Sequence, residues 1–160
     1  MKLDKKVYIV LIISLVLDQI SKALIDAFLK EEASIKIICN FLRFTKVSNT
    51  GAAFSILNNL TILLVLISIL SIVFLLYIKK EFKNTLKNKI AFGLILGGVI
   101  GNLIDRLILG YVRDFLDFNI FGYNYPIFNL ADSFIVIGVI ILIIDIIFGG
   151  KDEVSSKRGK

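Results

Sequence analysis

Residues 60–78 read LTILLVLISILSIVFLLYI and contain no charged side chain. A helix needs about 20 apolar residues to cross the hydrocarbon core of a bilayer, so this stretch predicts a transmembrane helix. Three further runs of similar length, at residues 7–25, 90–109 and 130–148, are nearly as apolar. Because the four runs fill about half of the chain, we expect a single membrane domain over residues 1–160.

The composition supports a membrane protein and excludes several chemistries. Hydrophobic residues make up 57% of the chain, and there is no His and one Cys. The lack of His excludes Ser/His/Asp and Cys/His nucleophile systems and the H-E-x-x-H zinc site, and a lone Cys excludes an intrachain disulfide or a Cys-rich metal site. We therefore expect no metal and no cofactor, and any catalysis must use carboxylates, Lys, Ser or Tyr.

The basic residues predict the orientation of the chain. Twelve lie before the first run, between the second and third, and after the fourth, whereas five lie in the segments 26–59 and 110–129. The positive-inside rule then places both termini in the cytoplasm and these two segments outside. The net charge of +6 is explained by this topology, so we expect no nucleic-acid partner. A cleaved signal peptide is an alternative for the first run, although Asp18 and Lys22 argue against it.

The outward segment 26–59 carries signals for short strands. Residues 35–38 and 41–47 partly alternate apolar and polar side chains of β-branched and aromatic type. Residues 49–51 predict a turn, and residues 52–57 predict a short helix on the membrane surface. The expected fold is an all-α integral membrane protein of four transmembrane helices with a small extracytoplasmic β-like cradle and a short surface helix.

Ionisable side chains inside the predicted spans point to a polar site. Each would cost about 2.5 to 3.5 kcal/mol if it faced lipid at mid-membrane. They are Asp18, Lys22, Asp105, Arg106, Asp132 and Asp145. At 1.5 Å per residue, all but Asp145 lie in the outer part of the membrane, where Asp114 follows the third span. We expect the outer group to converge and Asp145, about 20 Å from Asp132, to be structural.

Several of these residues also have a purely structural interpretation. Asp18 and Lys22 can form an ion pair on one helix face. Asp132 lies in a first helical turn, where it complements the helix dipole and Asn129 is a possible cap. Asp105 and its neighbour Arg106 face different directions and are expected to tie helices together.

Small residues on the third span predict close helix packing. Gly93, Gly97 and Gly101 repeat every fourth residue and give this helix a smooth face. Asn102 follows Gly101 and is expected to hydrogen-bond across that contact or to contribute to a polar pocket.

Asp114 and Asp132 form a candidate acid–base pair. Two carboxylates within about 3 Å share one proton, and such a pair can activate water and protonate a leaving amine without a metal. Spacing alone leaves Asp105 or Asp117 open for either role.

Other chemistries remain open at this point. A Ser-Lys dyad would join Lys22 to Ser21, Ser48 or Ser133. Outside the enzyme classes, the alternatives are a small proton-coupled membrane carrier and a structural scaffold.

Five blocks of sequence resemble the lipoprotein signal peptidase (signal peptidase II) family. In order they are DQISK (18–22), NTGAAFS (49–55), GVIGNLIDRL (98–107), VRDFLDF (112–118) and FNLADS (128–133). The resemblance implies an aspartic endopeptidase of the bacterial inner membrane, and we expect the chain to act as a monomer. Its partners would be membrane lipids and diacylglyceryl-modified prolipoproteins, which it would cut just before the modified Cys, near the outer face.

The resemblance also assigns roles to individual residues. It implies that Asp114 and Asp132 are the catalytic pair. It matches other positions to substrate binding or site shaping: Asn49, Gly51, Asn102, Asp105, Arg106, Asn129, Asp18 and Lys22. Two positions depart from the family, which usually has a small apolar residue at Arg113 and often has Trp at Tyr125. We expect Arg113 to point outward to the lipid headgroups and to leave Asp114 unaffected.

Overall fold

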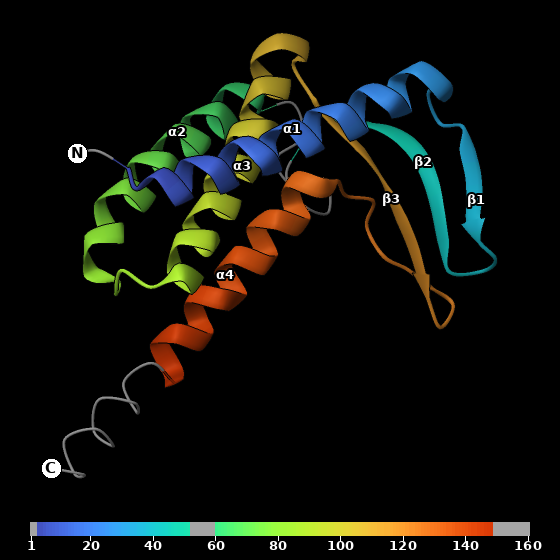
Figure 1. Cartoon of the computed structure of the whole chain (residues 1–160). Helices are drawn as coiled ribbons and strands as arrows, with labels where there is room; N and C mark the ends of the chain where they lie inside the picture. The colour runs from blue at the N-terminus through green and yellow to red at the C-terminus, as the bar shows by residue number, and fades with distance from the viewer. Residues whose placement is uncertain (1–2, 52–59, 149–160) are drawn as a thin grey trace, which may run out of the picture.

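The computed structural model describes residues 3–51 and 60–148, which form four long helices and a small sheet (Figure 1). In chain order the elements are α1 (Lys5–Phe28), β1 (Ser34–Ile38), β2 (Leu42–Asn49), α2 (Thr61–Ile78), the 3-10 turn η2 (Lys79–Glu81), α3 (Leu86–Leu109), β3 (Val112–Ile120), β4 (Tyr123–Asn124) and α4 (Leu130–Phe148). The surface helix predicted at residues 52–57 lies outside the described residues.

The four predicted spans are helices that are long and apolar enough to cross a membrane. Two of them begin earlier than hydropathy predicts, because polar residues cap them. The Asp4 side chain accepts a hydrogen bond from the Lys6 N–H, and the Thr85 side chain accepts one from the Asn88 N–H. Capping satisfies the first N–H groups of a helix, and it allows polar residues to form the first turn.

The helix α3 lies at the centre of the bundle and packs against α1, α2 and α4. Its glycines allow this close packing, as the sequence predicts. Gly93, Gly97 and Gly101 contact α1, and a Cβ atom at Gly97 would lie 2.8 Å from the Leu11 carbonyl oxygen. Gly98 lies in the same way against the Ala131 carbonyl of α4.

The strands form one antiparallel sheet in the order β1-β2-β3-β4. The strands β1 and β2 match the two predicted strand signals. The strand β3 was not predicted, because its charged residues interrupt the apolar pattern and both of its faces are partly buried. Pairing of β3 with β2 places Val47 opposite Asp114 and Asn49 opposite Val112.

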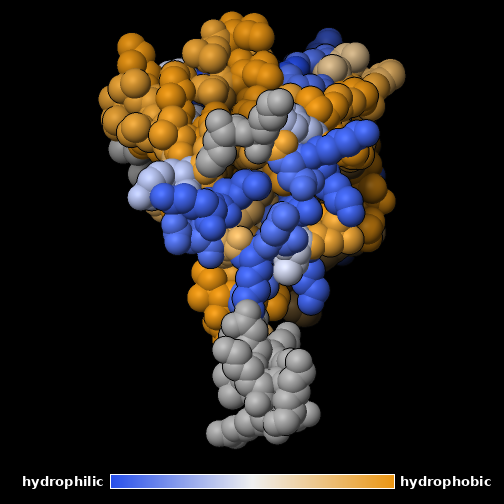
Figure 2. All heavy atoms as spheres, turned by 60° about the vertical axis from the view of Figure 1, so that its left-hand side comes forward, coloured by the Kyte–Doolittle hydropathy of each residue, from blue (hydrophilic) through white to orange (hydrophobic). Residues whose placement is uncertain are grey.

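The outer surface of the helices is apolar, and Figure 2 shows such side chains over much of one face. On α2 and α4, Leu70 is 66% exposed and Ile146 is 67% exposed. Hydrophilic side chains gather at the end of the bundle that holds the N-terminus and the α2–α3 connection, where Lys80, Lys83 and Lys87 are exposed. An apolar belt bordered by lysines is the surface expected of helices in lipid.

Substitution of Gly97 by Ala tests the α1–α3 packing. Alanine stabilises a free helix by about 1 kcal/mol relative to glycine. Here we expect the opposite sign, a loss of about 1 to 3 kcal/mol, because the new methyl group would overlap the Leu11 carbonyl and the Ser14 hydroxyl. Thermal unfolding in detergent measures the change, and Leu107→Ala, on the exposed side of α3, serves as the control. A Gly97→Ala protein as stable as the wild type would contradict the packing.

Candidate active site

A cavity of about 820 Å³ lies between the sheet and the helices α2, α3 and α4. It brings together five of the site residues predicted from the sequence, namely Asn49, Asn102, Arg106, Asp114 and Asp132. Most of the remaining wall is apolar and includes Leu64 and Ile67 of α2, Val99 of α3, and Ile135 and Val136 of α4. The cavity therefore joins a cluster of polar groups to walls that suit hydrocarbon.

The Asp114 carboxyl is 3% exposed and lies on β3. Its Oδ1 accepts a hydrogen bond from Asn129 Nδ2 at 2.6 Å, and its Oδ2 accepts one from Asn49 Nδ2 at 2.8 Å. Burial and, to a smaller degree, the nearby Asp132 carboxylate together raise the pKa of Asp114 to about 7, against the two amide donors. A carboxyl with this pKa can hold a proton at neutral pH.

Asp132 occupies the first turn of α4, and Asn129 caps this turn as predicted. Asn129 Oδ1 accepts a hydrogen bond from the Asp132 N–H at 3.0 Å, and Asp132 Oδ2 accepts one from the Asn129 N–H at 3.3 Å. Asp132 Oδ1 accepts a further hydrogen bond from Asn102 Nδ2 at 2.8 Å. The Asp132 carboxylate therefore takes part in the helix cap and also lines the cavity, so its structural role at the helix start is compatible with a role in the candidate acid–base pair.

The asparagines around the two carboxyls have fixed amide orientations. Asn49 Oδ1 accepts from the Gly51 N–H at 2.9 Å, and Asn102 Oδ1 accepts from Lys22 Nζ at 2.9 Å. A backbone N–H and an ammonium group can only donate, so each amide must turn its NH₂ group toward a carboxylate. The capping bond fixes Asn129 in the same way. The carboxyl pair is thus surrounded by hydrogen-bond donors, which favour an ionised member.

Arg106 contributes a positive charge to the wall of the cavity. Its Nη2 donates to the Gly51 carbonyl oxygen at 3.2 Å, and its charge acts on Asp132 and Asp114. From the sequence, Arg106 is predicted to tie helices together. In the described residues it instead holds the turn that contains Gly51.

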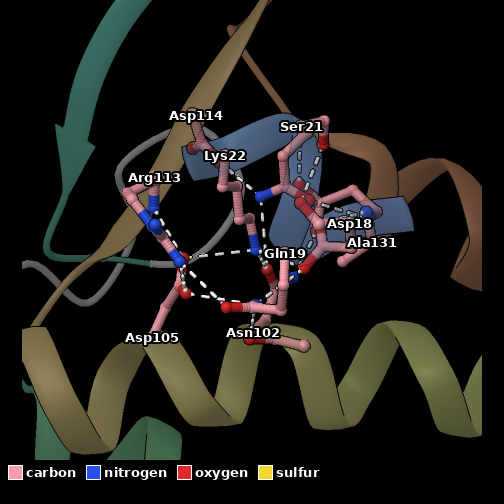
Figure 3. A network of polar contacts seen from close by, with 12 residues as sticks. Asp18, Gln19, Ser21, Lys22, Asn102, Asp105, Arg113, Asp114 and Ala131 are labelled. Atoms are coloured by element: carbon pink, nitrogen blue, oxygen red, sulfur yellow. Dashed lines mark hydrogen bonds and ion pairs between the residues drawn. The ribbon is translucent and has the colours of Figure 1, made fainter. Parts of the chain in front are cut away.

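The first-span residues Asp18 and Lys22 belong to a buried polar network that includes Asn102 of the cavity wall (Figure 3). Lys22 Nζ lies 2.9 Å from Asp18 Oδ2, as predicted, and also 3.2 Å from Asp105 Oδ2. All three side chains have no exposed surface. Asp18 Oδ1 accepts a hydrogen bond from the Ala131 N–H at 3.0 Å, so this cluster links α1 to α3 and to the start of α4.

The predicted outward orientation of Arg113 is wrong. Its guanidinium points to Asp105, with Nη2 at 2.7 Å from Oδ1, and it also donates to Gln19 and Asp26 (Figure 3). Successive side chains of a strand point to opposite faces, so Asp114 faces the cavity while Arg113 faces α1. The sequence does not reveal this inward orientation, because the buried acceptor Asp105 lies on a different element, α3.

The structure also bears on the other predicted candidates. Asp117 accepts hydrogen bonds from Arg43 through both of its oxygens, at 2.9 and 3.1 Å. Neither Asp117 nor Asp105 is among the described residues that line the cavity. Lys22 is engaged by Asp18, Asp105 and Asn102, which leaves a Ser-Lys dyad without support. Asp145 accepts a hydrogen bond from Asn88 at 2.8 Å, a structural contact as predicted.

Two residues of the network, Gln19 and Asp26, were not singled out from the sequence. Gln19 Nε2 donates to Asp18 Oδ2 at 3.1 Å and to the Gly101 carbonyl at 3.2 Å. The sequence signal for Gln19 is its position within the block DQISK, because a neutral amide does not stand out as a charged residue does in a membrane span.

Comparisons with known proteins show which family the chain is similar to. The family described as "Signal peptidase (SPase) II" matches residues 10–148. A lipoprotein signal peptidase of Staphylococcus haemolyticus (strain JCSC1435) is 41% identical over 148 residues, which cover 89% of this chain and 94% of that protein.

Two solved structures, both described as bacterial membrane enzymes, have similar folds. The first has a TM-score of 0.83 and 36% identity and covers 91% of this chain and 90% of its own. The second has a TM-score of 0.77 and 37% identity, with coverages of 88% and 91%.

Replacement of Lys22 by Met tests the buried cluster. The substitution leaves Asp18 and Asp105 buried without the ammonium group, and breaking a buried pair costs about 3 to 5 kcal/mol. We expect a loss of this size in the free energy of unfolding, measured by denaturant titration in detergent.

The matched control is Lys89→Met, which removes a partly exposed pair with Asp4 at 3.0 Å. We expect this control to lose less than about 1 kcal/mol. Equal losses of unfolding free energy in the two variants would mean that the buried cluster stabilises the protein no more than the partly exposed pair does.

Proposed function

This chain belongs to the signal peptidase (SPase) II family, and on that premise we propose that it is an aspartic endopeptidase that cleaves prolipoproteins before a diacylglyceryl-modified Cys. Family membership supports a multi-pass protease of the bacterial inner membrane that removes signal peptides from prolipoproteins. The observation that carries the finer proposal is that Asp114 and Asp132, which come from different elements, line one cavity and are both held by asparagine donors.

In the proposed reaction the two carboxyls share one proton. Asp114, with its raised pKa of about 7, carries this proton, and Asp132 is ionised. Asp132 removes a proton from a water molecule as the water oxygen attacks the scissile carbonyl carbon, and Asp114 donates its proton to the carbonyl oxygen. As the tetrahedral intermediate collapses, the C–N bond breaks, Asp132 gives the proton that it took from water to the leaving amine, and Asp114 takes back the proton of one hydroxyl as the new carboxyl group forms.

The asparagines and Arg106 support this chemistry. The amides of Asn102 and Asn129 keep each carboxyl in place while its charge changes. Arg106 stabilises the negative charge that passes between Asp132 and Asp114.

The apolar walls of the cavity suit a substrate that arrives from the bilayer. Leu64 and Ile67 of α2 face the cavity together with Ile135 and Val136 of α4. We propose that the lipidated peptide enters between α2 and α4, with its acyl chains still in lipid and its scissile bond at the carboxyl pair. The site then lies near the outer face of the membrane, with both termini in the cytoplasm, and the chain acts as a monomer.

Cleavage assays on Asp114→Asn and Asp132→Asn test the carboxyl pair. We expect each variant to remain folded and to lose at least about 100-fold in kcat, since an amide cannot act as acid or base. The substrate is a diacylglyceryl-modified prolipoprotein in detergent or nanodiscs, with its unlipidated form alongside. We expect the wild type to cut only the lipidated form.

The matched control is Asp117→Asn, on the same strand but outside the cavity, for which we expect activity close to wild type. Near-normal cleavage by either dyad variant would remove that Asp from the mechanism. A folded wild type that cuts neither substrate would contradict the proposed function.

The pH dependence tests which form of Asp114 is active. A raised pKa means that the protonated form is present below about pH 7 and is lost above it. We therefore expect kcat/KM to fall about tenfold per pH unit on the alkaline side of pH 7. A pH profile that stays flat to about pH 9 would contradict the assignment of Asp114 as the proton donor.

A further inference from the structure

Six charged side chains form a row of alternating sign, of which Figure 3 shows Asp18, Lys22, Asp105 and Arg113. In contact order they are Asp18, Lys22, Asp105, Arg113, Asp26 and Lys46. The five contacts measure 2.9, 3.2, 2.7, 3.1 and 2.7 Å. These six side chains carry three positive and three negative charges, and they join α1, α3, β3 and β2.

Within this row of charges, Arg113 directly precedes Asp114, the candidate carboxyl on β3, in the sequence. Its Nε and Nη2 donate to the two oxygens of Asp105 at 3.2 and 2.7 Å, and its backbone N–H donates to Oδ2 at 3.1 Å. Nη2 also donates to Gln19 at 3.0 Å, and Nη1 donates to Asp26 at 3.1 Å. The Arg113 side chain is 14% exposed, so its bonds to Asp105 and Gln19 are largely shielded from solvent, whereas the bond to Asp26 is exposed. A single guanidinium thus holds β3 against both α1 and α3.

The contacts of Arg113 also connect it to the second carboxyl, Asp132, through a series of side chains. Arg113 satisfies both oxygens of Asp105, so Lys22 can direct part of its hydrogen bonding to Asn102 Oδ1 at 2.9 Å. Asn102 in turn donates to Asp132 at 2.8 Å. Arg113 is therefore linked to Asp114 through the backbone and to Asp132 through side chains.

We infer that Arg113 is a positioning residue for the carboxyl pair, because its guanidinium fixes β3 on α1 and α3 and thereby sets the separation of Asp114 from Asp132. The inference deepens the proposed function and rests on it. It also gives a role to a residue that departs from the family's usual small apolar side chain at this position.

A positioning role differs in its effects from simple stabilisation. A displacement of about 1 Å at a reacting group can cost about 100-fold in rate, even when substrate binding is unaffected. Loss of Arg113 is therefore expected to lower kcat and to leave KM nearly unchanged.

The pH profile separates position from charge. The charged groups that act on Asp114 are Asp132 of α4, Arg106 of α3 and Lys22 of α1, and β2 contributes the neutral Asn49. If β3 moves away when Arg113 is lost, the repulsion from Asp132 weakens and the pKa of Asp114 falls. Loss of the positive charge alone would raise that pKa, so the two effects have opposite signs.

The experiment compares Arg113→Gln and Arg113→Lys with Arg43→Gln. The control removes Arg43 of β2, which also forms two bonds to one carboxylate, that of Asp117 on β3. For Arg113→Gln we expect kcat to fall about 10-fold to 100-fold and KM to change by less than about twofold. We also expect the alkaline limb of the pH profile of kcat/KM to move to lower pH. For Arg43→Gln we expect kcat to change by less than about threefold and the limb to stay in place.

Lysine at residue 113 keeps the charge but cannot make the same forked contacts with Asp105, Gln19 and Asp26. We expect Arg113→Lys to show an intermediate loss with the same direction of pH shift, and it provides the test if Arg113→Gln does not fold. Wild-type kcat and pH profile in a folded Arg113→Gln or Arg113→Lys protein, even with lower thermal stability, would overturn the positioning role. A shift of the alkaline limb to higher pH would also overturn it.

A titration without substrate separates this inference from the proposed function. The Asp114 carboxyl can be followed by infrared difference spectroscopy against Asp114→Asn, in the wild type and in Arg113→Gln. A lower Asp114 pKa in Arg113→Gln supports the positioning role even if no prolipoprotein is cleaved, and an unchanged or higher pKa counts against it.

Discussion

The structure depends on one buried charge, the ammonium group of Lys22. A lysine without exposed surface cannot be solvated by water, so its charge must be compensated by nearby acceptors. Asp18, Asp105 and Asn102 supply these acceptors from α1 and α3. Because Asp18 also accepts from the N–H of Ala131, the same cluster is bonded to the first turn of α4. The arrangement of three helices therefore follows from the solvation of a single cation.

Close packing of α3 allows this cluster to form. The side chain of Asp18 lies against Gly101, where a Cβ atom would come within 2.5 Å of its Oδ2. A larger residue would push α1 away and separate Lys22 from Asn102. The glycine face thus has a consequence beyond helix packing, because it brings an amide that contacts Asp132 within reach of a buried charge.

The cavity combines two environments that one element could not provide. The strand β3 and the start of α4 contribute the carboxyls, while the middle parts of α2, α3 and α4 contribute apolar walls. Buried carboxyls need donors, and the three asparagines supply them without adding a competing charge. This combination fits the proposed hydrolysis of a lipid-attached peptide.

The sequence by itself determined the four spans, the strand signals before residue 49 and the identity of the two candidate carboxyls. Hydropathy over about 20 residues is a local property, and the five sequence blocks carry the family resemblance directly. Only the tertiary structure decided that residues 112–120 form a strand, that Arg113 turns inward, and that Asp117 binds Arg43 outside the cavity. These outcomes depend on which partners lie across the fold. A strand with Asp and Arg on alternating faces has no simple apolar period, and the side that each charge chooses is set by acceptors and donors far away in the sequence.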